Sequence, residues 1–270
     1  PLDVHPDPRT DQPIAGPMGR TVADMALFLG VMRSAEVSAD PVPTAPRVAF
    51  SPDLGDLPVD PPVRAATART VDALADAGWE VVEACPDLTG ADRCFEDLRG
   101  LFQTFHMAPL VDDERVKATA RYEIRLGLSL DADRIAAAVA TEGRIRSDWD
   151  RFFVEGQFDA FLSPTTQVSP FPVGMEWVDE IDGVSLDHYT HWMRSCSRIT
   201  VTGAPSASLP AGFTDGGLPI GIQFAGRRHG DAALVALLAA AEEVLGTAPA
   251  PDIGALATLD PKTLPPGPLG

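Results

Sequence analysis

The side chains that could perform chemistry on their own are few and widely separated in this sequence. Five histidines are scattered over the chain, and only His188 and His191 lie close enough together to share a helix face with Asp187. A metal site there needs a third and a fourth ligand at suitable spacing, and the sequence offers neither. We therefore expect no metal and no cofactor.

A nucleophile is not indicated either. The pentapeptide Gly-x-Ser-x-Gly, which places a serine on a strained turn, does not occur in the sequence. The two lysines, Lys117 and Lys262, have polar neighbours, whereas a lysine that acts as a base needs surroundings that lower its pKa. The residues alone therefore predict no catalytic constellation, and none is assigned a catalytic role.

The elements that would position such residues follow from the apolar periodicity. Helical spacing predicts helices at about 22–32, 61–77, 95–105, 135–145, 186–198 and 231–245. Short alternating or apolar runs predict strands at 47–50, 79–82, 158–162, 206–210 and 220–225. A strand, a helix ending near Gly78 and a second strand form the pattern of a parallel α/β unit.

Composition limits the class of protein. The chain is 45% hydrophobic and 22% charged, which is typical of a globular protein. A net charge of −18 makes nucleic acid and anionic membranes poor partners, because both repel an acidic surface. No apolar run approaches the roughly 20 residues that span a bilayer. Three cysteines without pair spacing are typical of reduced thiols and indicate a cytoplasmic location.

Four segments, in order, resemble the amidase signature family. They are Gly16-Pro17-Met18-Gly19-Arg20-Thr21-Val22-Ala23-Asp24, the stretch Arg47–Val82, Phe158–Thr165, and Thr202–Phe213 followed by Gly217–Gln223. The resemblance covers all but about the last 20 residues. It implies an α/β fold, a mixed β-sheet flanked by helices on both faces. We accordingly divide the chain into an extended N-terminal loop (1–16), the C-terminal part of an amidase domain (17–246) and a Pro-rich tail (247–270).

The resemblance also implies an activity that this sequence does not complete. The family uses a nucleophilic serine, a serine in a cis peptide and a lysine, with a Gly/Ser-rich loop as oxyanion hole. All of these precede the Gly16-Pro17 segment, and neither the Gly-Gly-Ser-Ser-Gly-Gly run nor Lys-Pro-Ser/Thr occurs here. We expect the C-terminal portion of a hydrolase of a small carboxamide or aryl amide, inactive by itself.

The missing N-terminal half is then a partner of this chain. A sheet divided between two halves leaves an unpaired strand edge and an exposed apolar face in each. The sequence leaves a homodimer open. The resemblance places part of the acyl pocket in the present half, and the expected substrate-binding residues are Thr165, Thr166, Trp177, His191, Trp192 and Thr202. Simple packing at the sheet edge is the alternative for all six.

Two other functions remain as alternatives. The A subunit of a tRNA-dependent amidotransferase resembles this family, but carries an acidic residue in the helix before the Gly-x-Pro strand. The corresponding stretch, Tyr189–Arg194, contains no acid. A non-catalytic assembly module that has lost the active half is the second alternative.

Overall fold

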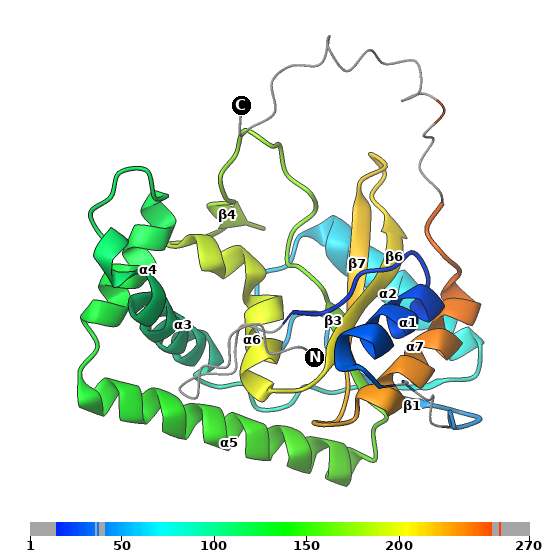
Figure 1. The fold of residues 1–270 in the computed structure, drawn as a ribbon. Coiled ribbons are helices and arrows are strands. Elements are labelled where there is room, and N and C mark those ends of the chain that lie inside the picture. Colours follow the sequence, from blue (N-terminus) through cyan, green and yellow to red (C-terminus); the bar gives the residue numbers. More distant parts are fainter. Residues whose placement is uncertain (1–14, 36, 38–40, 250–253, 255–270) are drawn as a thin grey trace.

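A computed structural model describes residues 15–35, 37, 41–249 and 254, and they form a mixed sheet with helices on both faces (Figure 1). The predicted fold class is confirmed. The sheet has five strands in the order β2-β1-β3-β7-β6. Their bounds are β1 Arg47–Phe50, β2 Glu80–Glu83, β3 Ala160–Pro164, β6 Ser206–Phe213 and β7 Pro219–Ala225. The predicted 1–16 loop and 247–270 tail lie largely outside the described residues.

Strand pairing confirms the predicted parallel unit. β1 pairs in parallel with both β2 and β3, whereas β7 runs antiparallel to β3 and to β6. β2 and β3 begin one and two residues later than the sequence predicted. At β3 the reason is local, because the Asp159 carboxylate accepts a hydrogen bond from the Arg47 amide and its own amide donates to the Arg47 carbonyl.

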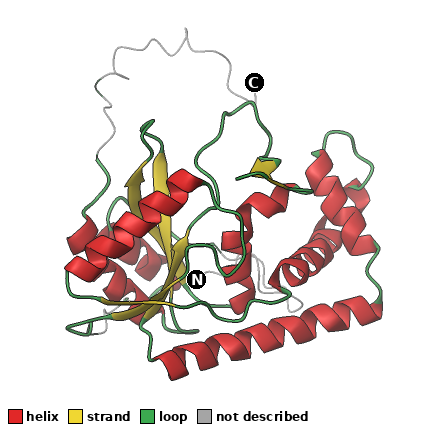
Figure 2. Cartoon of the chain, turned by 180° about the vertical axis from the view of Figure 1, so that it is seen from behind, coloured by secondary structure: helices red, strands yellow, loops and turns green. Residues whose placement is uncertain are grey.

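Two groups of helices cover the two faces of the sheet (Figure 2). On one face, α2 contacts β2, β3, β6 and β7, α7 contacts β6 and β7, and α1 packs on α7. On the other face lie α5 and α6, and α3 packs against α4, α5 and α6. The helix bounds are α1 Val22–Arg33, α2 Pro61–Asp76, α3 Ala91–Met107, α4 Ala118–Leu128, α5 Ala132–Gly156, α6 Arg194–Thr202 and α7 Asp231–Leu245.

The helices begin where the sequence supplies a start signal. The Thr21 side chain accepts a hydrogen bond from the Asp24 amide at the start of α1, and Asp131 caps α5 in the same way. Prolines occupy the first positions of α2, where their missing amide hydrogen costs nothing. The prediction of α7 at 231–245 is confirmed to the residue.

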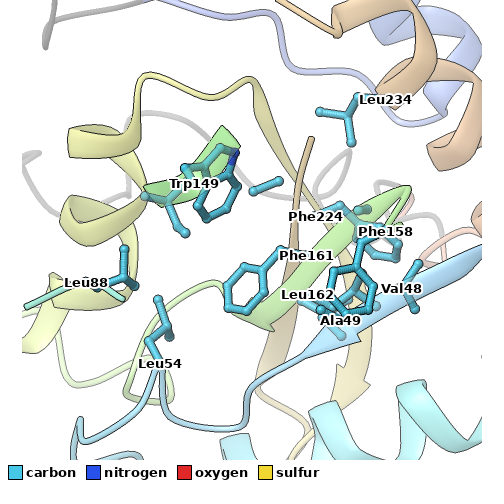
Figure 3. Close-up of a cluster of buried hydrophobic side chains, with 14 of the residues drawn as sticks. Val48, Ala49, Leu54, Leu88, Trp149, Phe158, Phe161, Leu162, Phe224 and Leu234 are labelled. Carbon is cyan, nitrogen blue, oxygen red and sulfur yellow. The ribbon is translucent and has the colours of Figure 1, made fainter. Parts of the chain in front are cut away.

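The core is built on β3, whose five residues are all buried. Figure 3 shows Trp149 of α5 approaching Phe161 of β3; their ring centroids are 5.7 Å apart. The Trp149 indole also donates a hydrogen bond to the Gly226 carbonyl at the end of β7. Because side chains alternate along a strand, Leu162 and its partner Phe224 pack on the opposite face, toward α2 and α7.

The predicted helix at 186–198 is wrong in its first half. Val184–Ser185 form strand β5, paired with β4 (Glu180–Ile181), and a 3₁₀ helix, η2, spans Tyr189–Met193 before α6 begins. Side chains cause the late start of α6, because His188 accepts a hydrogen bond from the Thr190 amide and His191 Nδ1 accepts one from the Asp187 amide. A second 3₁₀ turn, η1 (Ala108–Leu110), follows α3.

Candidate substrate-binding site

The first part of the candidate site lies where β3 ends. The Thr165 hydroxyl is 2.7 Å from the Ser208 hydroxyl of β6 and forms a hydrogen bond with it. The two meet above Gly221 of β7, where an added Cβ would lie 2.6 Å from Ser208 Oγ and 2.9 Å from Thr165 Oγ1. A side chain at position 221 would therefore force these two hydroxyls to move.

The first turn of α6 fixes the backbone of this loop. The Ser195 hydroxyl and the Cys196 thiol both donate to the Thr165 carbonyl, each at 2.9 Å. Thr166 turns away from that contact and donates its hydroxyl to the Val168 carbonyl at 2.9 Å. Thr165 and Thr166 are each partly exposed, so their side chains can still meet a molecule on this surface.

A hollow of about 350 Å³ opens directly before α6, and its walls come from four separate segments. That volume suits a small molecule. It adjoins a wider depression of about 610 Å³, because Lys117 and Glu176 line both. The smaller hollow is lined by residues of α3, of α4 and the turn before it, of the loop after β3, and of η2, among them Arg99, Gln103, Lys117, Thr119, Glu123, Glu176, Tyr189 and Trp192.

A buried carboxylate organises the polar wall of this hollow. The Glu123 side chain is 4% exposed and accepts hydrogen bonds from Arg99 at 2.5 Å, Gln103 at 3.1 Å and Tyr189 at 2.5 Å. These three hydrogen bonds replace the hydration that the carboxylate loses on burial. Burial, together with the hydrogen bond to Glu123, raises the pKa of Tyr189 to about 12, so its phenol is neutral at physiological pH.

The predicted aromatic residues gather beside this hollow. Trp192 lines it and contacts Phe171, with ring centroids 5.3 Å apart. Trp177 packs into the same small apolar cluster as Trp192, formed around Val168, Ile181 and Leu186. Trp192 Nε1 is buried and has no hydrogen-bond partner among the described residues.

His191 lies on the same segment but is occupied by the protein. Its Nε2 is 3.2 Å from a Glu96 oxygen, while its Nδ1 accepts from the Asp187 amide. That arrangement fits a neutral ring that donates through Nε2. His188, the other histidine here, has its pKa lowered by burial. Within the described part of the chain, no three His, Cys, Asp or Glu side chains are grouped so that they could hold a metal ion.

Thr202, the sixth expected residue, is separated from the others. It is fully buried, and its hydroxyl donates to the Ile199 carbonyl at 2.6 Å and accepts from the Ala204 amide at 3.2 Å. These bonds close the last turn of α6. Of the six expected residues, Trp192 alone lines the hollow, and Trp177 shares its apolar cluster. His191 contacts Glu96 of α3, and the first turn of α6 holds the Thr165 carbonyl.

Sequence reasoning missed Arg99, Gln103, Glu123 and Tyr189. Arg99 and Gln103 are spaced i, i+4, which puts them on one helix face, but that spacing is common on exposed helices. No local signal marked Glu123, because its burial depends on partners from α3 and η2.

This arrangement can bind and orient a small molecule. The thiols offer no activated nucleophile, because burial raises the pKa of Cys85 to about 11 and that of Cys94 to about 12. Burial also raises the pKa of Cys196. All three therefore stay protonated at neutral pH, and a protonated thiol is a poor nucleophile.

Comparison with known proteins identifies the class. The amidase family model matches residues 8–235, and the chain belongs to the amidase signature family. It is 33% identical over 244 residues to an indoleacetamide hydrolase of Bradyrhizobium japonicum, covering 83% of this chain and 50% of the relative. An acylamidase of Rhodococcus erythropolis is 28% identical over 255 residues, covering 85% and 52%.

A solved bacterial aryl acylamidase of the amidase signature family has the same fold, with a TM-score of 0.72 and 21% identity, over 85% of this chain and 52% of that one. A glutamyl-tRNA(Gln) amidotransferase A subunit of Myxococcus xanthus is 39% identical over 98 residues, or 36% of this chain and 18% of the relative. The chain spans about half the length of the curated hydrolases it matches. Among the described helices, none has the length and apolar character needed to cross a bilayer.

Proposed function

We propose that this chain is the C-terminal portion of an amide hydrolase for small carboxamides or aryl amides, with a serine, a cis-peptide serine and a lysine contributed by an upstream portion. One observation carries the proposal. The chain belongs to the amidase signature family over residues 8–235, yet its sequence lacks both the Gly/Ser-rich run and the Lys-Pro-Ser/Thr of that mechanism.

The relatives support the substrate class. One is named for the hydrolysis of an indole-bearing carboxamide and another for an acylamide. The hollow beside η2 is consistent with such substrates, since it combines an indole, Trp192, with the polar Gln103 and Tyr189. An aromatic substrate ring would pack on the indole.

We assign substrate contact to Thr165, Thr166, Trp177, His191 and Trp192. Thr202 is buried and would act only by holding the last turn of α6. Three free cysteines are compatible with a cytoplasmic protein. A small-molecule amide is the ligand we expect, and the upstream half of the fold is the partner.

The experiment starts from the coding sequence upstream of Pro1. We expect a Gly/Ser-rich run and a Lys-Pro-Ser/Thr there, and hydrolysis of indole-3-acetamide or a chromogenic anilide by the complete protein. Absence of both motifs, or a complete protein inert toward every simple amide, would refute the proposal.

Transfer of ammonia to an aminoacyl-tRNA is the second candidate, favoured by the amidotransferase match. The absence of an acid in Tyr189–Arg194 argues against it. Ammonia release from glutamine that greatly exceeds hydrolysis of simple amides by the complete protein would favour this candidate. A non-catalytic module is favoured instead if the 270-residue chain proves stable and partnerless in cells.

A further inference from the structure

His188 caps the start of η2 with its own ring. Its backbone is extended, and its Nδ1 accepts a hydrogen bond from the Thr190 amide at 3.4 Å. The Thr190 hydroxyl lies 2.9 Å from the same nitrogen. Because an amide can only donate, Nδ1 carries no proton in this arrangement, and the hydroxyl donates to it as well. The ring is therefore neutral, with its proton on Nε2.

The contacts of this ring suit only its neutral form. His188 Nε2 is buried and has no hydrogen-bond partner among the described residues. A proton added at Nδ1 would point at the Thr190 amide. Thr190 is 3% exposed, so its amide would then be left without an acceptor in a buried place, which is unfavourable.

The charges around the ring have both signs. Burial is the largest effect and lowers the pKa of His188, Glu123 acts in the opposite direction, and His191 and Arg99 add to the lowering. The titratable groups that surround the ring come from every element packed against it, namely Tyr122 and Glu123 of α4, Glu96 and Arg99 of α3, and Tyr189 and His191 of η2.

We propose that His188 is a pH-sensitive switch, which holds η2 against α3 and α4 at neutral pH and releases it as the pH falls. η2 carries Tyr189, which bonds to Glu123 and Arg99, and Trp192, which lines the hollow. Release of η2 therefore removes part of the wall of the hollow. That this step weakens substrate binding rests on the proposed function, whereas the switch itself does not.

The direction of the switch follows from the two states of η2. In the released state the His188 ring meets water and titrates near 6.5. In the capping state its pKa is lower, so the released state binds more protons as the pH falls. The cap contributes its full stability above about pH 7, and that stability is lost progressively below about pH 6.5.

The test is hydrogen exchange of residues 189–194 in the full 270-residue chain at pH 7.5 and pH 5.5, corrected for the intrinsic pH dependence of exchange. We expect opening of this segment, relative to α7, to rise about threefold to tenfold, because a single group that titrates near 6.5 allows about tenfold at most over this range. His188→Asn should abolish the rise, since asparagine can accept from the same amide but does not titrate.

His229→Asn is the matched control. His229 is exposed, lies outside η2 and has a φ of 62°, a conformation that asparagine tolerates. This variant should keep the rise of the wild type. Nitrogen NMR of labelled histidine provides a second measurement, in which neutral His188 should carry its proton on Nε2.

Three results would overturn the proposal: a rise below threefold in the wild type, the same rise in His188→Asn, or a proton on Nδ1 of neutral His188. None of these measurements involves hydrolysis. If the complete protein proved inactive toward amides while η2 opened as expected, the proposed function would fail and the switch would stand.

Discussion

Tyr189 illustrates how a residue of this site depends on its partners. It donates to Glu123 and accepts from Arg99 at 3.0 Å, so one phenol joins η2 to α3 and α4. The raised pKa means that the folded chain holds this proton to a higher pH than the unfolded chain, in which tyrosine titrates near 10. Its contribution to stability is full below about pH 10 and is lost as the pH rises toward about 12.

Replacing Tyr189 by Phe tests this linkage. At pH 8 we expect the free energy of unfolding to fall by about 1 kcal/mol, because the hydrogen bonds of the phenol are missing. Between pH 10 and pH 12 the stability of the variant should fall less steeply than that of the wild type, since the titrating phenol is gone. Urea unfolding midpoints at several pH values measure both effects. Parallel pH profiles would contradict the assignment.

Arg198 is the most extensively bonded cation of α6 within the described residues. It is 8% exposed, donates twice to Asp92 of α3 at 2.8 Å, and donates to Asp56 at 2.6 Å and to the Leu54 carbonyl at 3.0 Å. Arg198→Met should lower the free energy of unfolding by about 2–3 kcal/mol, because Asp92 keeps only its longer contact with Arg194, at 3.5 Å, and some solvent. Chemical denaturation measures the loss.

Arg115 is the matched control for this substitution. Its side chain is 89% exposed and pairs with Asp113, and exposed ion pairs of this kind contribute little to stability. Arg115→Met should therefore leave the unfolding midpoint nearly unchanged. Equal effects of the two substitutions would show that burial of the Arg198 cluster contributes nothing.

Trp192 tests the substrate wall in the complete protein. Trp192→Ala should lower kcat/KM for an aryl amide about tenfold or more, because a packed aromatic contact is worth roughly 1.5 kcal/mol or above. Most of the loss should appear in KM, since the contact is made in ground and transition state alike. Val139→Ala, on the exposed side of α5, serves as control. Unchanged KM would place the substrate elsewhere.

At the scale of elements, the α3–α4 pair forms the wall of the hollow only because the two helices touch. A Cβ added to Gly127 would overlap the Gly100 carbonyl and the Thr104 hydroxyl. Gly127→Ala should therefore lower the free energy of unfolding by about 1–3 kcal/mol, because the added methyl group forces the helices apart. Thermal unfolding measures this loss of stability. The fluorescence of Trp192, which lines the hollow, reports its widening.

Gly143 provides the comparison within α5. A Cβ there would meet nothing within 4 Å, so Gly143→Ala should be neutral or stabilising by about 0.5–1 kcal/mol. If Gly127→Ala proved equally harmless, the close helix contact would have to be rejected.

Local signals predicted most elements, missed α4, β4 and β5, and were wrong in the segment before α6. The Pro61-Pro62 start of α2 and the Thr21 cap of α1 act within a single turn, so the sequence displays them directly. The segment before α6 was predicted as helix because apolar spacing there resembles one. The bonds that His188 and His191 make to nearby amides redirect the backbone, and such competition is invisible in a hydrophobic pattern.

At the scale of the whole molecule, the isolated 270-residue chain should not hydrolyse a chromogenic anilide, because its sequence lacks the serine and lysine motifs of the family mechanism. It should also be marginally stable or prone to aggregate despite its charge, since Leu27, Phe28 and Val31 of α1 are exposed. An enzyme assay and a thermal scan with reheating check these expectations. Measurable turnover, or a sharp and reversible transition of a monomer, would contradict them.

The sequence by itself determined the family and the sheet, because motifs around Gly16-Pro17 and Gly203-Ala204-Pro205 and periodic apolar runs are local properties of the chain. It also determined that neither the Gly-Gly-Ser-Ser-Gly-Gly run nor Lys-Pro-Ser/Thr occurs among these residues. Only the tertiary structure decided which polar residues meet. Arg99, Glu123 and Tyr189 come from three elements up to 90 residues apart, and no local pattern specifies a contact between distant segments.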